Sequence, residues 1–287
     1  MMVLGTIFSF VFGAIVGSFL NVVALRYNTG ATLRGRSRCF ACARDLQWFD
    51  LVPIASFLVL RGRCRSCGSS ISLQYPIVEL LTGIVFALIF LQQTASSVQQ
   101  TFFSFDAPAS TWLPVTSYQL LVTSYRWLVW SLLIAISVYD LRHKIIPNGL
   151  VYIFIALAFL NAFDAWNLFG NWKLEIGNLV HGPLLAAPLA GLWLLSGGRW
   201  MGLGDAKLAA GIGWLLGLSR GITALALSFW FGALISLGVL LAQRLGLFFS
   251  RGAVTMKSEI PFGPFLVVGT FLAWFFELDV AALVRWF

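Results

Sequence analysis

Long apolar segments are the feature of this sequence that most limits how it can fold. There are eight of them, at 2–25, 77–93, 118–139, 149–168, 179–197, 207–219, 221–243 and 262–284. A helix needs about 20 apolar residues to cross the hydrocarbon core of a bilayer. Only 10% of the residues are charged, whereas soluble domains contain about 25%. We therefore predict an all-α polytopic membrane protein with about eight transmembrane helices.

Two of these segments allow a second interpretation. The segment 207–219 is short, so seven spans and one re-entrant piece are the alternative to eight spans. The first segment has the length of a signal peptide. It has no basic start and no small-residue cleavage site, so we interpret it as a retained membrane helix.

The Lys and Arg residues alternate between the two sides of the predicted membrane. Fifteen of them fall in segments on one side and three on the other, and Arg126 lies within a span. Loop 94–117 has none. Because cytoplasmic loops are enriched in Lys and Arg, the rich side is cytoplasmic and both termini face outward. This distribution accounts for the net charge of +8 without a nucleic acid partner.

All four cysteines lie in the first cytoplasmic segment, 26–76, as two C-x-x-C pairs. They are Cys39, Cys42, Cys64 and Cys67. Two such pairs complete a tetrahedral zinc site with no open position for a substrate. We predict a structural zinc ion that shapes a small domain, and four reduced thiols in a packed turn are the alternative. A disulfide is disfavoured in the reducing cytoplasm, and a redox role would need only one pair.

Two aspartates lie at the predicted cytoplasmic edge of the membrane. Asp140 ends the third span, and Asp205 follows two glycines in the loop between the fifth and sixth spans. If they are brought together, the ionised carboxyl activates a water and the protonated one polarises a peptide carbonyl. The pair predicts an aspartic protease site. The alternative for each aspartate alone is an ordinary charge at a membrane boundary.

The residues around Asp205 are candidates for a supporting role. We expect Gly202 and Gly204 to adopt positive φ and to let a substrate strand approach closely. Lys207 has two interpretations: it anchors the helix on the cytoplasmic side, or it forms an ion pair that holds Asp205 in place.

The chain resembles the type IV prepilin peptidases, the leader peptidases of bacterial type IV pilus and type II secretion systems. Five motifs carry the resemblance along nearly the whole chain: GSFLNVVALR (17–26), the cysteine segment with the start of the second span (37–83), DLRHKIIPN (140–148), MGLGDAKLAA (201–210) and EIPFGPFL (259–266). The fourth contains the Gly-x-Gly-Asp signature shared with presenilin-type intramembrane proteases. Phe40 departs from the pattern, since the first C-P-x-C turn usually has proline there.

The resemblance implies an aspartic endopeptidase of the bacterial inner membrane that cuts prepilins and pseudopilins after the glycine preceding their hydrophobic helix. Asp140 and Asp205 inherit the catalytic role, and the four cysteines inherit the zinc role. For members with the four-cysteine segment, it also implies methyl transfer from S-adenosylmethionine to the new N-terminal residue. Glu79 then has two interpretations: it contacts the substrate's amino terminus or the methyl donor, or it is a buried helix-packing acid.

We expect three parts in the chain: a first transmembrane helix at 1–25, the zinc segment at 26–76 and the peptidase bundle at 77–287. The expected partners are prepilin substrates and membrane lipids. Three other functions compete with this one. A transporter would carry acids at span centres and an internal repeat, and the sequence has neither. A scaffold would leave the aspartates without a role, and a peptidase without methyltransferase activity is the third.

Overall fold

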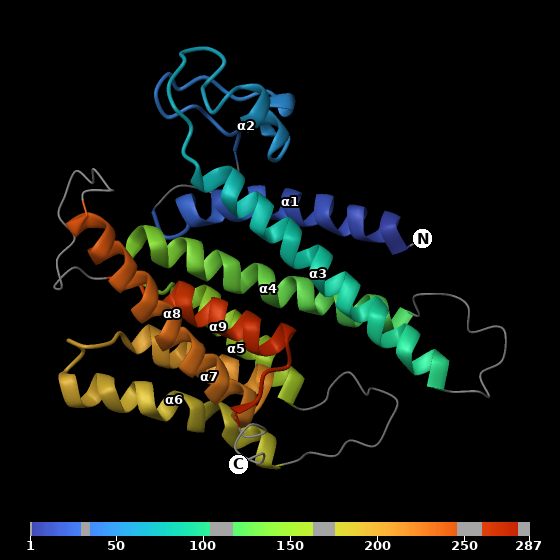
Figure 1. Ribbon diagram of the computed structural model, residues 1–287. Coiled ribbons are helices and arrows are strands. Elements are labelled where there is room, and N and C mark those ends of the chain that lie inside the picture. Colours follow the sequence, from blue (N-terminus) through green and yellow to red (C-terminus); the bar gives the residue numbers. More distant parts are fainter. Residues whose placement is uncertain (1, 30–34, 104–116, 163–175, 246–259, 281–287) are drawn as a thin grey trace. The chain divides into compact units, whose positions relative to one another are not determined.

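All regular elements of the described residues are helices. The computed structural model describes residues 2–29, 35–103, 117–162, 176–245 and 260–280 (Figure 1). The chain divides into two compact units, Met1–Ala135 and Ile136–Phe287. The all-α prediction is confirmed.

A helix coincides with each of the eight apolar segments. Five are long and apolar enough to cross a membrane: α1 (Met2–Arg26), α3 (Gln74–Phe103), α4 (Ser117–His143), α6 (Ile176–Ser196) and α8 (Leu218–Arg244). Three are shorter: α5 (Asn148–Ala162), α7 (Leu203–Leu216) and α9 (Gly263–Phe275). Helix α3 continues to Phe103, so residues 94–103 are helical and not part of a loop as predicted. Residues 104–116 of that loop and the ends of two expected spans, 163–168 and 281–284, lie outside the described residues. The number of helices that cross the membrane stays a prediction.

In the first unit, α1 packs along α3. Glycines of α1 lie at the contact: a Cβ at Gly13 would be 2.7 Å from a backbone carbonyl of α3, and one at Gly17 would be 2.8 Å from the Cα of Glu79. Small residues are common at such contacts because membrane helices associate through close packing. The cysteine segment, with η1 (Trp48–Leu51) and α2 (Ala55–Val59), connects these two helices in the chain (Figure 1).

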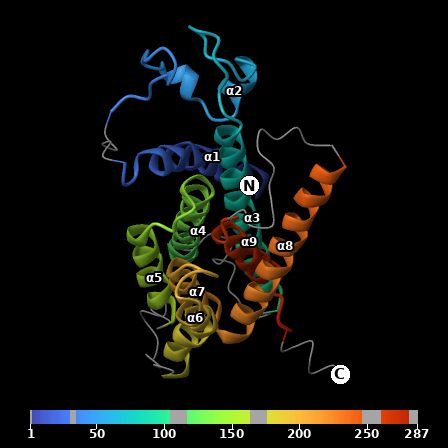
Figure 2. The same ribbon diagram turned by 90° about the vertical axis from the view of Figure 1, so that its left-hand side faces the viewer.

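In the second unit, α7 is the central helix, since it contacts α5, α6, α8 and α9. Its side chains Leu208, Ala209 and Ile212 are completely buried. Figures 1 and 2 both show α6 and α7 side by side. The helix ends before Gly217, which has a φ of 79°, a left-handed conformation that glycine adopts without strain. Because of these contacts, α7 is enclosed by the other helices of its unit.

The end of α4 and the start of α7 meet in this unit. Helix α4 ends at His143, and Lys144 follows with a φ of 54°. The chain then turns back towards α7, where a Cβ added to Gly204 would lie 2.8 Å from the Cβ of Ile146. This close approach requires a residue without a side chain at the start of α7.

Candidate functional site

Two loops of the cysteine segment share one backbone pattern. In each, the first cysteine donates its N–H to the carbonyl five residues later, and its own carbonyl accepts from the N–H four residues later. The bonds are Cys39–Arg44 at 3.0 Å, Cys64–Ser69 at 2.8 Å, Ala43–Cys39 at 2.9 Å and Gly68–Cys64 at 2.9 Å. Ala43 and Gly68 both have positive φ, 56° and 70°. The repeated turn gives both C-x-x-C pairs the same local shape.

The two loops bring the four thiol groups together. Their ligand atoms all lie within 4.8 Å of one another, and the Sγ atoms of Cys39 and Cys67 are 3.8 Å apart. A tetrahedral zinc ion with Zn–S bonds of about 2.3 Å separates its sulfur ligands by about 3.8 Å. The cluster therefore fits a four-coordinate metal ion. The prediction that the cysteines form one cluster is confirmed, and zinc itself stays a prediction.

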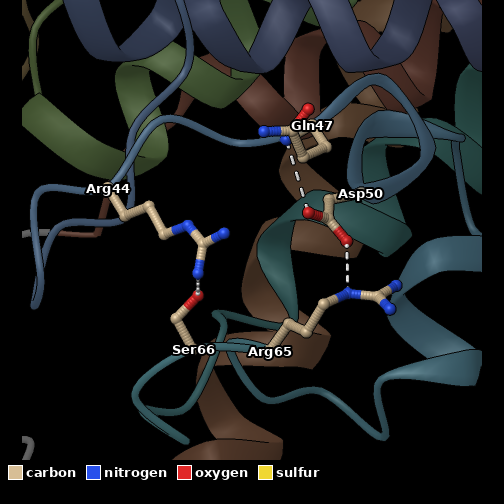
Figure 3. Close-up of polar contacts among 5 residues, drawn as sticks. All are labelled: Arg44, Gln47, Asp50, Arg65 and Ser66. Atoms are coloured by element: carbon tan, nitrogen blue, oxygen red, sulfur yellow. Dashed lines mark hydrogen bonds and ion pairs between the residues drawn. The ribbon is translucent and has the colours of Figure 1, made fainter.

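Polar side chains join the two cysteine loops (Figure 3). Arg44 Nη1 donates to the Ser66 hydroxyl at 2.9 Å. Asp50 lies beside them: its Oδ1 accepts from Arg65 Nε at 3.0 Å, and its Oδ2 accepts from the backbone N–H of Gln47 at 3.3 Å. These contacts connect the residues that follow Cys42 with the loop between Cys64 and Cys67.

Hydrogen bonds favour the thiolate form of two cysteines. The backbone N–H groups of Cys42 and Ala41, followed by the Ser69 hydroxyl, lower the pKa of Cys39 to about 6. The Ser69 hydroxyl also lowers the pKa of Cys67. Metal ions bind the thiolate, so a lowered pKa reduces the number of protons that must leave on binding. Cys39 and Cys67 are thus prepared for a metal ion, whereas desolvation and the neighbouring Cys39 and Cys67 thiols raise the pKa of Cys42 to about 11.

Asp140 and Asp205 are brought together in the second unit. They are only 3% and 8% exposed, and they are close enough for the charge of Asp140 to act on the Asp205 carboxyl. Asp140 lies in the last turn of α4, as expected. Asp205 was expected in a loop but lies in the first turn of α7, because that helix begins at Leu203. The partial positive charge of a helix N-terminus stabilises a carboxylate there.

Gly263 is a site residue to which the sequence analysis gave no role. Its N–H donates to Asp140 Oδ2 at 3.0 Å, and a Cβ at this position would lie 2.7 Å from the same oxygen. Glycine therefore supplies a hydrogen bond and leaves room for the carboxylate. The signal in the sequence is the Pro-Phe-Gly-Pro run at 261–264, in which the chain turns into α9.

The two glycines before Asp205 do not have the expected backbone conformation. Gly202 has a φ of −77°, and Gly204 is absent from the positive-φ glycines of the described residues. The expectation of positive φ is wrong because α7 begins between them, so both take ordinary cap and helix conformations. Gly204 instead leaves room for Ile146. A Cβ at Gly202 would make an ordinary contact with Asp205 Oδ2, at 3.5 Å.

Lys207 joins α7 to α5. Its Nζ donates to Asn148 Oδ1 at 2.9 Å and to the Tyr152 hydroxyl at 3.0 Å, and it lies 5.0 Å from the centre of the Tyr152 ring. Among the described residues, the ion pairs do not include Lys207 with Asp205. The sequence analysis did not identify Asn148 or Tyr152 as its partners.

Glu79 belongs to the first unit, near the start of α3. The residue is 7% exposed, and its Oε2 accepts from the backbone N–H of Ile54 at 2.7 Å. The Ser18 side chain of α1 lies close enough to act on this carboxyl group. Glu79 therefore connects α3 with α1 and with the cysteine segment.

Comparisons with known proteins give the family. Residues 11–93 match the bacterial peptidase A24 N-terminal domain, and residues 127–237 match the type IV leader peptidase family. A prepilin leader peptidase/N-methyltransferase of Bacillus subtilis (strain 168) is 31% identical over 268 residues, which cover 93% of this chain and 92% of the relative. A protein of the same name from Neisseria gonorrhoeae is 28% identical over 309 residues, covering 96% and 92%.

Another relative matches a shorter part more closely. The prepilin leader peptidase/N-methyltransferase of Myxococcus xanthus (strain DK1622) is 52% identical over 81 residues, 28% of this chain and 24% of the relative. No solved structure matches the chain. The similarity to the Bacillus subtilis protein extends over nearly the full length of both chains, and the two matched domains include the cysteine cluster and the aspartate pair. The chain therefore belongs to the type IV leader peptidase family.

Proposed function

We propose that this chain is a membrane aspartic endopeptidase that removes the leader peptides of prepilins and pseudopilins, cutting after the glycine that precedes their hydrophobic helix. The observation that carries the proposal is the pair of buried, interacting carboxyls of Asp140 and Asp205. Burying two acids that repel each other is unfavourable, and acids within membrane helices generally serve a function. The family supplies the substrate class.

The pair can hydrolyse a peptide bond with one shared proton. Two like charges at close range do not both ionise, so one carboxyl is ionised and the other protonated. The ionised carboxyl takes a proton from water as the water oxygen adds to the scissile carbonyl carbon, and the protonated carboxyl gives its proton to the carbonyl oxygen. When the resulting diol collapses, the C–N bond breaks. The leaving nitrogen takes the first proton, and the second carboxyl recovers its own from the diol.

Gly263 supports this chemistry by fixing one carboxyl. Its N–H binds Asp140 Oδ2 at 3.0 Å, so that oxygen is held as an acceptor while the other remains available for water or substrate. Asp205 is fixed differently, by its place in the first turn of α7. The two acids therefore approach from the end of one helix and the start of another.

We place this site at the cytoplasmic side of the bacterial inner membrane. The support is the excess of Lys and Arg in the segments that flank Asp140 and Asp205 and in the cysteine segment. A prepilin would insert its apolar helix into the surrounding lipid beside the bundle, and its leader would stay in the cytoplasm. The scissile bond would then lie level with the two carboxyls.

We also infer that the chain methylates the new N-terminal residue, with the methyl group supplied by S-adenosylmethionine. This part rests on the names of the relatives, which include N-methyltransferase. The parts of the chain that the structure describes contain no strand, and thus no strand–loop–helix nucleotide site. We assign the methyl transfer to the cysteine segment and its surroundings, because the resemblance implies this activity for members that have the four-cysteine segment.

The experiment that tests the function uses purified full-length protein in lipid nanodiscs. A synthetic prepilin is incubated with it, with and without S-adenosylmethionine, and the products are weighed by mass spectrometry. We expect one cut after the glycine, and a product heavier by one methyl group only when the methyl donor is present. An intact prepilin, or cutting at other bonds, would contradict the peptidase proposal.

Removing the metal ion should unfold the cysteine segment. We propose that Cys39, Cys42, Cys64 and Cys67 bind one structural zinc ion, and such ions contribute on the order of 10 kcal/mol to the folding of small domains. Cys64→Ser should therefore reduce the zinc content to near zero and expose the segment to limited proteolysis. The measurements are metal analysis by mass spectrometry and mapping of the proteolytic cuts.

The control is Ser66→Ala, within the same loop. It removes only an exposed hydrogen bond from Arg44, so the variant should keep its zinc and its protease resistance. Full protease resistance of Cys64→Ser without metal would show that the segment folds without zinc.

A further inference from the structure

The cysteine segment contains a strained turn immediately before α2. The carbonyl of Pro53 accepts from the N–H of Ala55 at 2.5 Å, and Ile54 between them has a φ of 61° and a ψ of −51°. These values are those of the γ-turn with positive φ, which is rare and strained. Positive φ is especially unfavourable for a β-branched residue such as isoleucine. A conformation of this kind persists only where its surroundings hold it.

Glu79 supplies a contact that can hold this turn. Its Oε2 accepts from the N–H of Ile54, the strained residue itself, at 2.7 Å. A carboxylate acceptor makes a stronger hydrogen bond than a neutral one. The ion pairs of the described residues do not include Glu79. Its hydrogen bond is the one from the Ile54 N–H.

The position of Glu79 suits an anchor. Its Cα lies where α1 and α3 approach closely, 2.8 Å from a Cβ placed on Gly17. The packing of α1 against α3 therefore fixes the backbone of Glu79. Its side chain binds Ile54, which lies 25 residues earlier in the chain, in the cysteine segment. An acid that only packed between the helices would not need a hydrogen bond from the strained Ile54 N–H.

We propose that Glu79 is a positioning residue that holds the Pro53–Ile54–Ala55 turn and thereby fixes the cysteine segment against α3 and α1. The proposal rests on the proposed function in one respect: the segment that Glu79 positions is the part to which we assign methyl transfer. Cleavage depends on Asp140 and Asp205 of the other unit, so it should not depend on this hydrogen bond. Glu79 acts through the turn and does not itself react.

The test compares three substitutions in the full-length protein in nanodiscs. Glu79→Ala removes the acceptor, whereas Glu79→Gln removes the charge and keeps an oxygen that can accept from Ile54. The double variant Ile54→Gly/Glu79→Ala places glycine in the turn, where positive φ is unstrained. Asp45→Asn is the control, because it alters an acid of the same segment that pairs with Arg38 at the surface. Amide hydrogen exchange at residues 52–58 is measured together with cleavage and methylation.

We expect exchange at residues 52–58 to accelerate at least about tenfold in Glu79→Ala, because the turn opens locally. The methylated fraction of the product should fall by at least about tenfold, because misplacement of an active-site segment lowers the rate. Glu79→Gln should keep methylation within about threefold of the wild type, since it keeps the hydrogen bond. The double variant should recover part of the loss, and Asp45→Asn should match the wild type.

Three results would overturn the proposal. Unchanged exchange in Glu79→Ala would mean that Glu79 does not hold the turn. Equal defects in Glu79→Gln and Glu79→Ala would mean that the charge matters and not the hydrogen bond. If Glu79→Ala lost cleavage and methylation equally, the turn would not serve methyl transfer specifically. Failure of the proposed function is distinguishable, because the wild type itself would then not cleave, while the exchange measurement would still test the turn.

Discussion

Replacing either Asp140 or Asp205 with asparagine should abolish leader cleavage. Asparagine has the size of aspartate but neither gives nor takes a proton in this reaction, so the remaining carboxyl would lack its partner. Acid–base groups of this kind contribute about 10²–10⁴-fold to a rate, so we expect each variant to lose at least about 10³-fold in kcat. The measurement is the initial rate of cleavage of a synthetic prepilin by purified variants in nanodiscs.

Glu277→Gln is the matched control for this prediction. It makes the same acid-to-amide change in the same unit, at an exposed residue that pairs with Arg220 at 3.5 Å. An exposed pair contributes little, so cleavage should stay within about twofold of the wild type. If Asp140→Asn or Asp205→Asn cleaved as fast as Glu277→Gln, that aspartate would not be catalytic.

The second large effect should come from one added methyl group at Gly263. In Gly263→Ala, the Cβ would lie 2.7 Å from Asp140 Oδ2, closer than real side chains allow. The carboxyl must then move, and displacements of this size at an active site cost about 10²-fold in rate. We expect kcat to fall by about that factor with little change in KM, because in the proposed mechanism the prepilin helix lies in the lipid beside the bundle. The steady-state kinetics of cleavage measure both constants.

Gly238→Ala in α8 separates this effect from a general effect of alanine. A Cβ at Gly238 meets nothing within 4 Å, and alanine favours a helix over glycine. This variant should keep its activity within about twofold. If the two alanine variants behaved alike, the contact between Gly263 and Asp140 would have no role in the reaction.

The parts of the fold that depend on local sequence were predictable. Hydropathy located these eight helices, because an apolar segment can be recognised from consecutive residues without knowledge of their contacts. The spacing of the four cysteines predicted their cluster for a similar reason, since each C-x-x-C pair folds into its own turn. The predicted ends were less accurate: α3 continues to Phe103 instead of 93, and α9 ends at Phe275 instead of 284. Helix α7 begins at Leu203 and so includes Asp205, which was expected in a loop.

The contacts that define the site were not predictable, because they join residues far apart in the chain. Gly263 and Asp140 are 123 residues apart, and Lys207 and Asn148 are 59 apart. Hydrophobic patterns carry no information on such pairs. The conformations of Gly202 and Gly204 depended on where α7 begins, which is among the least certain features of a sequence-based analysis.

The strained turn at Ile54 shows a further limit. Nothing in the sequence suggests positive φ at an isoleucine, because intrinsic preferences oppose it. In the structure, a buried acid from another element binds its N–H. The sequence analysis left two interpretations of Glu79, a contact with the substrate or methyl donor and a buried packing acid, and the structure adds its contact with Ile54.

The central claim is that Asp140 and Asp205 act as one unit, and a double-mutant cycle on ligand binding tests it most directly. The ligand is a prepilin peptide in which a hydroxyl-bearing, uncleavable group replaces the scissile bond and so resembles the diol. Its affinity is measured for the wild type, Asp140→Asn, Asp205→Asn and the double variant. If the two carboxyls hold the hydroxyl jointly, each single variant should lose nearly as much affinity as the double variant. Additive losses, or full affinity in either single variant, would contradict the account.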